Sequence, residues 1–244
     1  MTPRASSDPL PKALVAVTAV TAIVDAVAFL GLGQIFTAFM TGNLLFLGFA
    51  AAGADGLEPL GSGTALTAFA AGAVVGSRLG AAMADRRYRL WLFTSASTAA
   101  TLLVAAGVTA IGLDLVDQRD PVPRHLVVIA LTALAMGLRS ATMWRLGAVL
   151  NTTLVTGTLV TLIRTSALGG GTGGELQRYR AAGLMAVVGG AAIGTLLLRV
   201  GLSAALLAAA AGVMAGMGAY VAHPASRRRP GKRDGAGRGG VTGG

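Results

Sequence analysis

The chain has 244 residues, of which 54% are hydrophobic and only 12% are charged, and its mean hydropathy is +0.70. Soluble domains carry roughly 25% charged residues, so the polar surface of a water-soluble globule is missing and that class is excluded. The 20 lysines and arginines outnumber the 10 aspartates and glutamates. Most flank apolar stretches or lie in the C-terminal tail, which indicates anchors beside anionic lipid rather than nucleic-acid binding. The composition predicts a polytopic membrane protein whose main partner is the lipid bilayer.

Residue types that carry catalysis and metal binding are scarce in this chain. It has no cysteine and two histidines, so it lacks thiolate ligands and cysteine nucleophiles. His125 and His223 both fall at the ends of apolar segments, which disfavours a histidine-based site. No G-x-S-x-G, H-E-x-x-H or paired-carboxylate pattern is present. We therefore expect neither an enzyme nor a bound cofactor or metal.

Eight apolar segments run along the chain, each near the ~20 residues that cross a bilayer as a helix. They are residues 12–31, 34–53, 62–84, 90–113, 124–145, 148–168, 181–199 and 201–222. Polar punctuation separates them, and the ends of the chain are polar and low in complexity. We expect a disordered arm at 1–11, a first membrane repeat at 12–113, an extracytoplasmic loop at 114–124, a second membrane repeat at 125–222 and a disordered basic tail at 223–244.

The two membrane repeats share a sequence pattern. MTGNLLFL at 40–47 aligns with VTGTLVTL at 155–162, and the same alignment places Asp25 opposite Arg139. Two pairs of glycines also match, Gly72 and Gly76 with Gly190 and Gly194. Matches in the same order along both halves predict an internal duplication.

The distribution of charge selects a topology. Eight full crossings would place outside a set of arginines that membrane proteins keep inside, namely Arg78, Arg86, Arg87, Arg89, Arg145 and Arg199. If 34–53 and 148–168 instead enter and leave by one face, both termini and most arginines are cytoplasmic. Each Thr-Gly pair lies about ten residues from either end of its segment, or ~15 Å of helix, half of a ~30 Å hydrocarbon core.

The predicted fold is therefore an all-α polytopic membrane protein. It consists of two inverted repeats of three crossings each, and each repeat contains a re-entrant, broken-helix hairpin with its Thr-Gly tip near the midplane. The alternative is eight full spans in two parallel repeats, with Thr-Gly marking only close helix packing.

Inverted repeats with broken helices are a recurring design of secondary transporters. Irregular backbone at membrane depth is tolerated only inside protein or along a wet cavity, so the tips predict a polar interior. The candidate substrate-binding residues are Asp25, Thr41, Gly42, Asn43, Arg139, Thr156, Gly157 and Thr158. We expect a transporter or channel for a small polar solute or anion. The alternative is a non-transporting module that binds a partner or lipid.

Three features of the membrane interior keep more than one interpretation. A charge within a span costs ~2.5–3.5 kcal/mol on insertion scales and is usually paired or functional. Asp25 and Arg139 therefore have three interpretations. In the first they brace the hairpins, with or without a mutual salt bridge, and in the second they form a solute or proton site. In the third, Arg139 extends inward toward Arg145. The glycines Gly72, Gly76 and Gly80 serve either packing within the monomer or a sliding or homodimer interface.

Two stretches resemble a known family. VDAVAFLGLGQIFTAFMTGNLLFLG at 24–48 and GLRSATMWRLGAVLNTTLVTGTLVTL at 137–162 are similar to signatures of the YoaK (DUF1275) family, and the resemblance covers roughly 12–222. It implies a multi-pass protein of the bacterial cytoplasmic membrane and no particular activity. Where that family commonly has Gln-Asn, this chain has Arg139-Ser140. A neutral amide pair would brace a hairpin equally well, so the departure argues against a required Asp25–Arg139 bridge.

Overall fold

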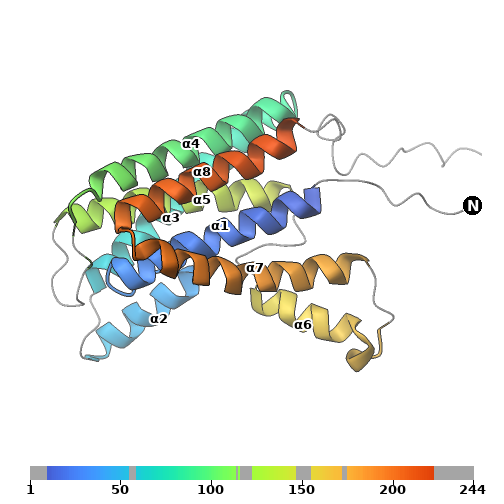
Figure 1. Ribbon diagram of the computed structural model, residues 1–244, viewed down its shortest axis with the longest axis horizontal. Helices are drawn as coiled ribbons and strands as arrows, with labels where there is room; N and C mark the ends of the chain where they lie inside the picture. Colours follow the sequence, from blue (N-terminus) through green and yellow to red (C-terminus); the bar gives the residue numbers. More distant parts are fainter. Residues whose placement is uncertain are drawn as a thin grey trace, which may run out of the picture.

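The computed structural model describes residues 10–54, 59–113, 115, 123–146, 155–171 and 175–222. These residues form α-helices and one short 3₁₀ helix, with no strand among them, which confirms the predicted all-α class (Figure 1). In chain order the elements are α1 (Leu10–Gly31), α2 (Met40–Ala51), α3 (Pro59–Met83), α4 (Tyr88–Thr109), α5 (Pro123–Arg145), α6 (Val155–Thr165), η2 (Ala167–Gly169), α7 (Glu175–Leu198) and α8 (Leu202–Ala222).

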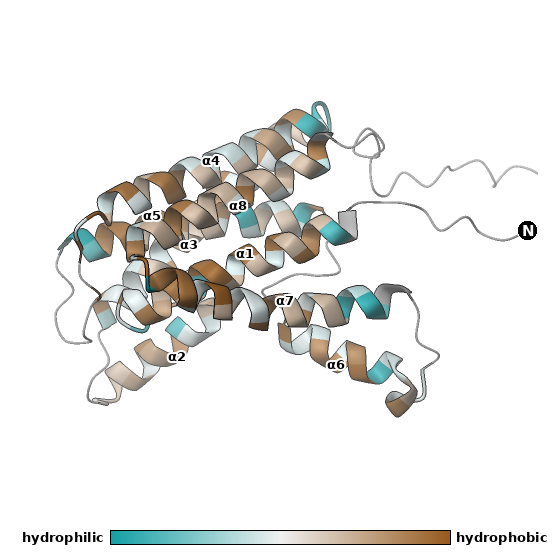
Figure 2. Cartoon of the chain, viewed as in Figure 1, coloured by the Kyte–Doolittle hydropathy of each residue, from teal (hydrophilic) through white to brown (hydrophobic). Residues whose placement is uncertain are grey.

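Six of the described helices are long and apolar enough to cross a membrane: α1, α3, α4, α5, α7 and α8. Figure 2 shows their middles mostly apolar, with hydrophilic residues gathered toward the ends. By contrast, α2 has 12 residues and α6 has 11. At 1.5 Å per residue these measure about 18 and 17 Å, too short for a ~30 Å hydrocarbon core. The described helices therefore fit a polytopic protein, and α2 is too short for the second apolar segment to cross as one helix.

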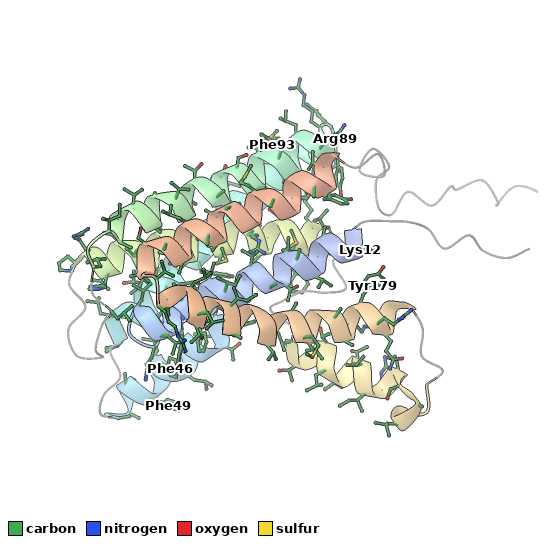
Figure 3. The ribbon with its side chains drawn as sticks, in the orientation of Figure 1. Lys12, Phe46, Phe49, Arg89, Phe93 and Tyr179 are labelled. Carbon is green, nitrogen blue, oxygen red and sulfur yellow. The ribbon has the colours of Figure 1, made fainter. Side chains whose placement is uncertain are left out.

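One end of the bundle collects basic side chains, and we call it the basic end. Here Arg89 at the start of α4 donates to the carbonyl oxygen of Val221, near the end of α8, at 2.6 Å. Arg145 closes α5 there, beside the end of α3. Figure 3 places the starts of α1 and α7 toward the same end, marked by Lys12 and Tyr179.

The opposite end joins the remaining helix termini. Arg124 at the start of α5 donates to the carbonyl oxygens of Thr109 and Ile111, at 2.7 and 2.9 Å, where α4 finishes. Gly31 closes α1 against Leu202, which begins α8. Helices α1, α4 and α7 therefore run away from the basic end, and α3, α5 and α8 run back toward it. The first long helices of the two halves, α1 and α5, have opposite directions.

Helix packing pairs the two halves. The closest pairs are α3 with α5 and α1 with α7, while α4 lies against α8. The contact of α4 with α5 has its counterpart in that of α8 with α1, and α2 on α3 has its counterpart in α6 on α7. Exchanging the halves therefore reproduces the same set of neighbours.

Glycines permit the two closest pairs. A Cβ atom built on Gly72 would lie 2.1 Å from the carbonyl oxygen of Leu134 on α5. One built on Gly190 would lie 2.3 Å from the carbonyl oxygen of Ala19 on α1. Gly76 and Gly194 repeat these approaches one turn further along their helices. The aligned glycines therefore have equivalent roles, because each pair lets two helix backbones of one chain approach closely. The homodimer predicted from the glycine-rich faces stays a prediction.

The second apolar segment departs from the prediction. Residues 34–39 are not helical, so the expectation that the first arm of this hairpin is a half-helix is wrong. Gly33 has φ +90° and Gln34 has φ +59°, and this left-handed turn ends α1. Helix α2 then starts at Met40, directly before the predicted Thr-Gly tip. The matching arm before α6 includes residues 147–154, which lie outside the described residues.

Adding a methyl group where the helices approach most closely separates packing glycines from exposed ones. We expect Gly190→Ala to lower the free energy of unfolding by about 1–3 kcal/mol, because the new Cβ collides with the α1 backbone. Its neighbour Gly189 has no heavy atom within 4 Å of a built Cβ, so Gly189→Ala is the matched control. Unfolding of both variants is followed in detergent micelles. Equal loss in the two variants would contradict the close approach of α1 and α7.

Candidate substrate site around Asp25 and Arg139

The carboxylate of Asp25 holds the chain segment that leads into α2. Its Oδ1 accepts from the backbone N–H groups of Thr37 and Ala38, at 2.7 and 2.8 Å, and from the Thr37 hydroxyl at 3.0 Å. Its Oδ2 accepts from the N–H of Phe39 at 3.0 Å. The side chain is buried within the helix bundle, where neither lipid nor bulk water would satisfy these donors. The negative charge also lies at the positive end of the α2 dipole.

Asn43 fixes the same segment from the other side. Its Oδ1 accepts from the N–H of Phe36 at 3.0 Å, and its Nδ2 donates to the carbonyl oxygen of Phe36 at 2.6 Å. The Phe36 ring lies over Gly42, where a Cβ atom would come within 2.5 Å of it, and stacks on Phe29 at 4.9 Å. Asn43 and Gly42 thus hold Phe36, in the non-helical segment 34–39, against the start of α2.

Arg139 lies on α5 and is 6% exposed. Its Nη2 donates to the carbonyl oxygen of Val17 on α1, and its Nη1 contacts the sulfur of Met136 at 3.6 Å. Asp25 attracts it electrostatically, but no ion pair within 4 Å joins the two among the described residues. Its burial also contradicts the interpretation that it extends to the interface beside Arg145.

Two small cavities flank the Arg139 side chain, each of about 10 Å³, which is room for about one water molecule. The first lies between α1, α4, α5 and α8 and includes Ser95 and Thr142 in its wall. The second lies between α1, α5 and the segment before α2, with Thr21 and Ala38 in its wall. Since Ala38 also donates to Asp25, this second cavity connects the surroundings of the two charged residues.

The remaining predicted residues lie apart from this cluster. Thr41 is exposed, as are Thr156 and Gly157, and Thr158 is half-buried. Helix α6 packs on α7 and has no buried residue. The structure therefore brings Asp25, Asn43 and Arg139 into the interior and leaves the second Thr-Gly pair at the surface.

The candidate residues chosen from the sequence leave out three polar residues of the interior. The hydroxyls of Ser95 on α4 and Thr142 on α5 lie 2.6 Å apart, and Thr37 supplies two of the donors to Asp25. Thr142 follows Arg139 by three residues, the spacing of one helix face, so its place was detectable. Ser95 belongs to a stretch rich in hydroxyl side chains, and only the packing of α4 on α5 singles it out.

Replacing Asp25 with asparagine tests the carboxylate. The amide keeps one acceptor, but its NH₂ group faces the N–H of a backbone donor, so at least one buried donor loses its partner. We expect Asp25→Asn to lower the free energy of unfolding by about 1.5–3 kcal/mol, the range for hydrogen bonds to charged groups. Leu44→Ala on the exposed face of α2 is the control, and unfolding is measured in mixed micelles. A change no larger than that of the control would contradict this assignment.

Comparison with known proteins agrees with the architecture. Residues 13–219 match the family described as "Protein of unknown function (DUF1275)". A relative, UPF0700 transmembrane protein YoaK of Bacillus subtilis (strain 168), is 34% identical over 142 residues. That alignment covers 58% of this chain and 60% of the relative. No solved structure matches. The chain is a transmembrane protein and belongs to the DUF1275 family.

Proposed function

We propose that this protein is a transporter or channel for a small polar solute or anion. The observation that carries the proposal is the interruption of the second apolar segment inside the helix bundle. The backbone N–H groups of this interruption donate to the carboxylate of Asp25. Interrupted helices at membrane depth are costly, and they recur where secondary transporters place their substrate and ion sites. A protein that needed only to anchor or pack would be more simply built from continuous spans.

The arrangement of the two halves supports the same proposal. In our interpretation, α1–α4 and α5–α8 form two inverted repeats of three crossings each. The opposite directions of α1 and α5 and the matched helix contacts favour this interpretation. The half-helices α2 and α6 are then equivalent elements, and in Figure 1 they point toward opposite ends of the bundle. Such symmetry gives a carrier two related gates, one for each side of the membrane.

The charge distribution supports an orientation. The basic end carries Arg86, Arg87, Arg89 and Arg145, and cytoplasmic loops of membrane proteins are enriched in such residues. We infer that the basic end faces the cytoplasm of a bacterial cell, with both termini on that side. In this orientation α2 is part of the extracytoplasmic gate and α6 is part of the cytoplasmic one.

The described conformation is closed around Arg139, since the two cavities beside it hold about one water molecule each. Transport therefore requires movement, and the half-helices are suited to it because each packs mainly on a single long helix. The same small cavities favour the second candidate, a non-transporting module that binds a partner or lipid, in which the interior is only structural.

Solute entry into vesicles distinguishes these candidates. The purified protein is reconstituted into liposomes, and stopped-flow light scattering follows their swelling. The neutral solutes are glycerol and urea. The anions are supplied as potassium chloride, potassium nitrate or potassium formate, with valinomycin to carry the potassium. We expect at least one solute to enter about tenfold faster than in protein-free vesicles. Ala38→Leu should abolish this gain, because Ala38 lines the cavity at Arg139 and the larger side chain fills it.

The control for this experiment is Ala70→Leu, which makes the same change on the exposed face of α3 and should leave the rate unchanged. Size-exclusion profiles in detergent verify that both variants fold. If folded wild-type protein accelerates none of these solutes, the transport proposal fails and the non-transporting module replaces it.

A further inference from the structure

We propose that Arg139 and the two cavities beside it bind one small monovalent inorganic anion. The assignment of this anion as a transported species rests on the proposed function, whereas its binding is measurable without any transport. Three observations carry the proposal: the charge balance around Arg139, the size of the cavities, and the hydroxyl pair in the wall of one of them.

The charge balance leaves the Arg139 guanidinium without an ion pair within 4 Å among the described residues. A guanidinium stays protonated in proteins, and this one is buried, with a carbonyl oxygen and a thioether as its neighbours within hydrogen-bonding distance. Asp25 is the nearby acid, but its oxygens already accept four hydrogen bonds from the segment before α2. It also forms no ion pair with Arg139 within 4 Å. A buried charge without a close counter-charge is unfavourable, so the site favours an incoming anion.

The geometry supplies both donors and space. Arginine has five N–H donors in a fixed fork, and the Arg139 side chain uses one on Val17 and one on Met136. The side chain also lines two cavities of about 10 Å³ each. A space of that size holds about one water molecule, which suits a halide or a similarly small ion after slight expansion. Sulfate and organic anions of the size of gluconate are too large.

The hydroxyl pair can add a neutral donor without backbone movement. Thr142 Oγ1 lies 3.0 Å from the carbonyl oxygen of Leu138 and 2.6 Å from Ser95 Oγ. While the Thr142 proton points at Leu138, Ser95 must donate to Thr142. If the Thr142 proton turns to Ser95 instead, the Ser95 proton is released toward the cavity that both residues line. An anion there would accept hydrogen bonds from Ser95 and Arg139 together.

Thermal unfolding of the full chain in detergent tests the proposal. The protein is transferred to sodium gluconate, and chloride, bromide, nitrate or sulfate replaces gluconate at constant ionic strength, with tryptophan fluorescence as the signal. We expect chloride to raise the unfolding temperature in a saturable manner and sulfate to leave it unchanged. Arg139→Gln should remove the chloride effect, and Ser95→Ala should weaken apparent chloride affinity by about tenfold, the loss of one charge-assisted hydrogen bond. Arg145→Gln, an exposed arginine on the same helix, should keep it.

Each outcome decides the matter. The proposal is overturned if wild-type protein shows no difference between chloride and gluconate, or if Arg139→Gln responds like wild type. Should Arg139→Gln fail to fold, the double variant Ser95→Ala, Thr142→Val takes its place, and an undiminished chloride response in it would overturn the proposal. Chloride binding without flux in vesicles would uphold this site and reject transport. Glycerol or urea flux without any anion response would reject this site and uphold transport.

Discussion

The interior depends on the hydrogen bonds that the carboxylate of Asp25 accepts. A chain that leaves helical geometry inside a membrane exposes backbone donors that hydrocarbon cannot satisfy, and here one side chain accepts from three consecutive N–H groups and a hydroxyl. Asn43 completes the arrangement by pairing with both backbone groups of Phe36. With these contacts in place, α2 can start within the bundle, and residues 32–39 can return into it after α1 ends. Without them, a continuous helix would be the more favourable structure.

The glycine contacts determine which helices surround that interruption. Gly72 and Gly76 bring α3 onto α5, and Gly190 and Gly194 bring α7 onto α1, so the two helices that carry Arg139 and Asp25 are each held by a close-packed partner. Helices α4 and α8 then enclose the side of Arg139 where Ser95 and Thr142 meet. The long helices pack on several neighbours, whereas α2 and α6 each pack mainly on one long helix, α3 and α7.

Much of this could be predicted from the sequence, for identifiable reasons. Span lengths follow from hydropathy and bilayer thickness, and the glycine pairs could be aligned because close packing leaves only small residues. Asp25 was conspicuous because an acid within a span is expensive. The non-helical course of 34–39 could not be predicted, since its apolar residues suit a buried helix equally well and the deciding contact comes from Asp25, twelve to fourteen residues earlier. The Ser95–Thr142 pair depends on helix packing that no local pattern encodes.

Two inverted repeats of three crossings require the second and sixth apolar segments to turn back within the membrane. Since the chain has no cysteine, single cysteines at Ala54, Arg87 and Leu168, all exposed, can be labelled in intact cells with a membrane-impermeant maleimide. We expect labelling at position 54, just after α2, and none at 87 or 168 until the membrane is permeabilised. Labelling at 87 without labelling at 54 or 168 would mean that both segments cross completely, and it would contradict the interrupted interior on which the proposed function rests.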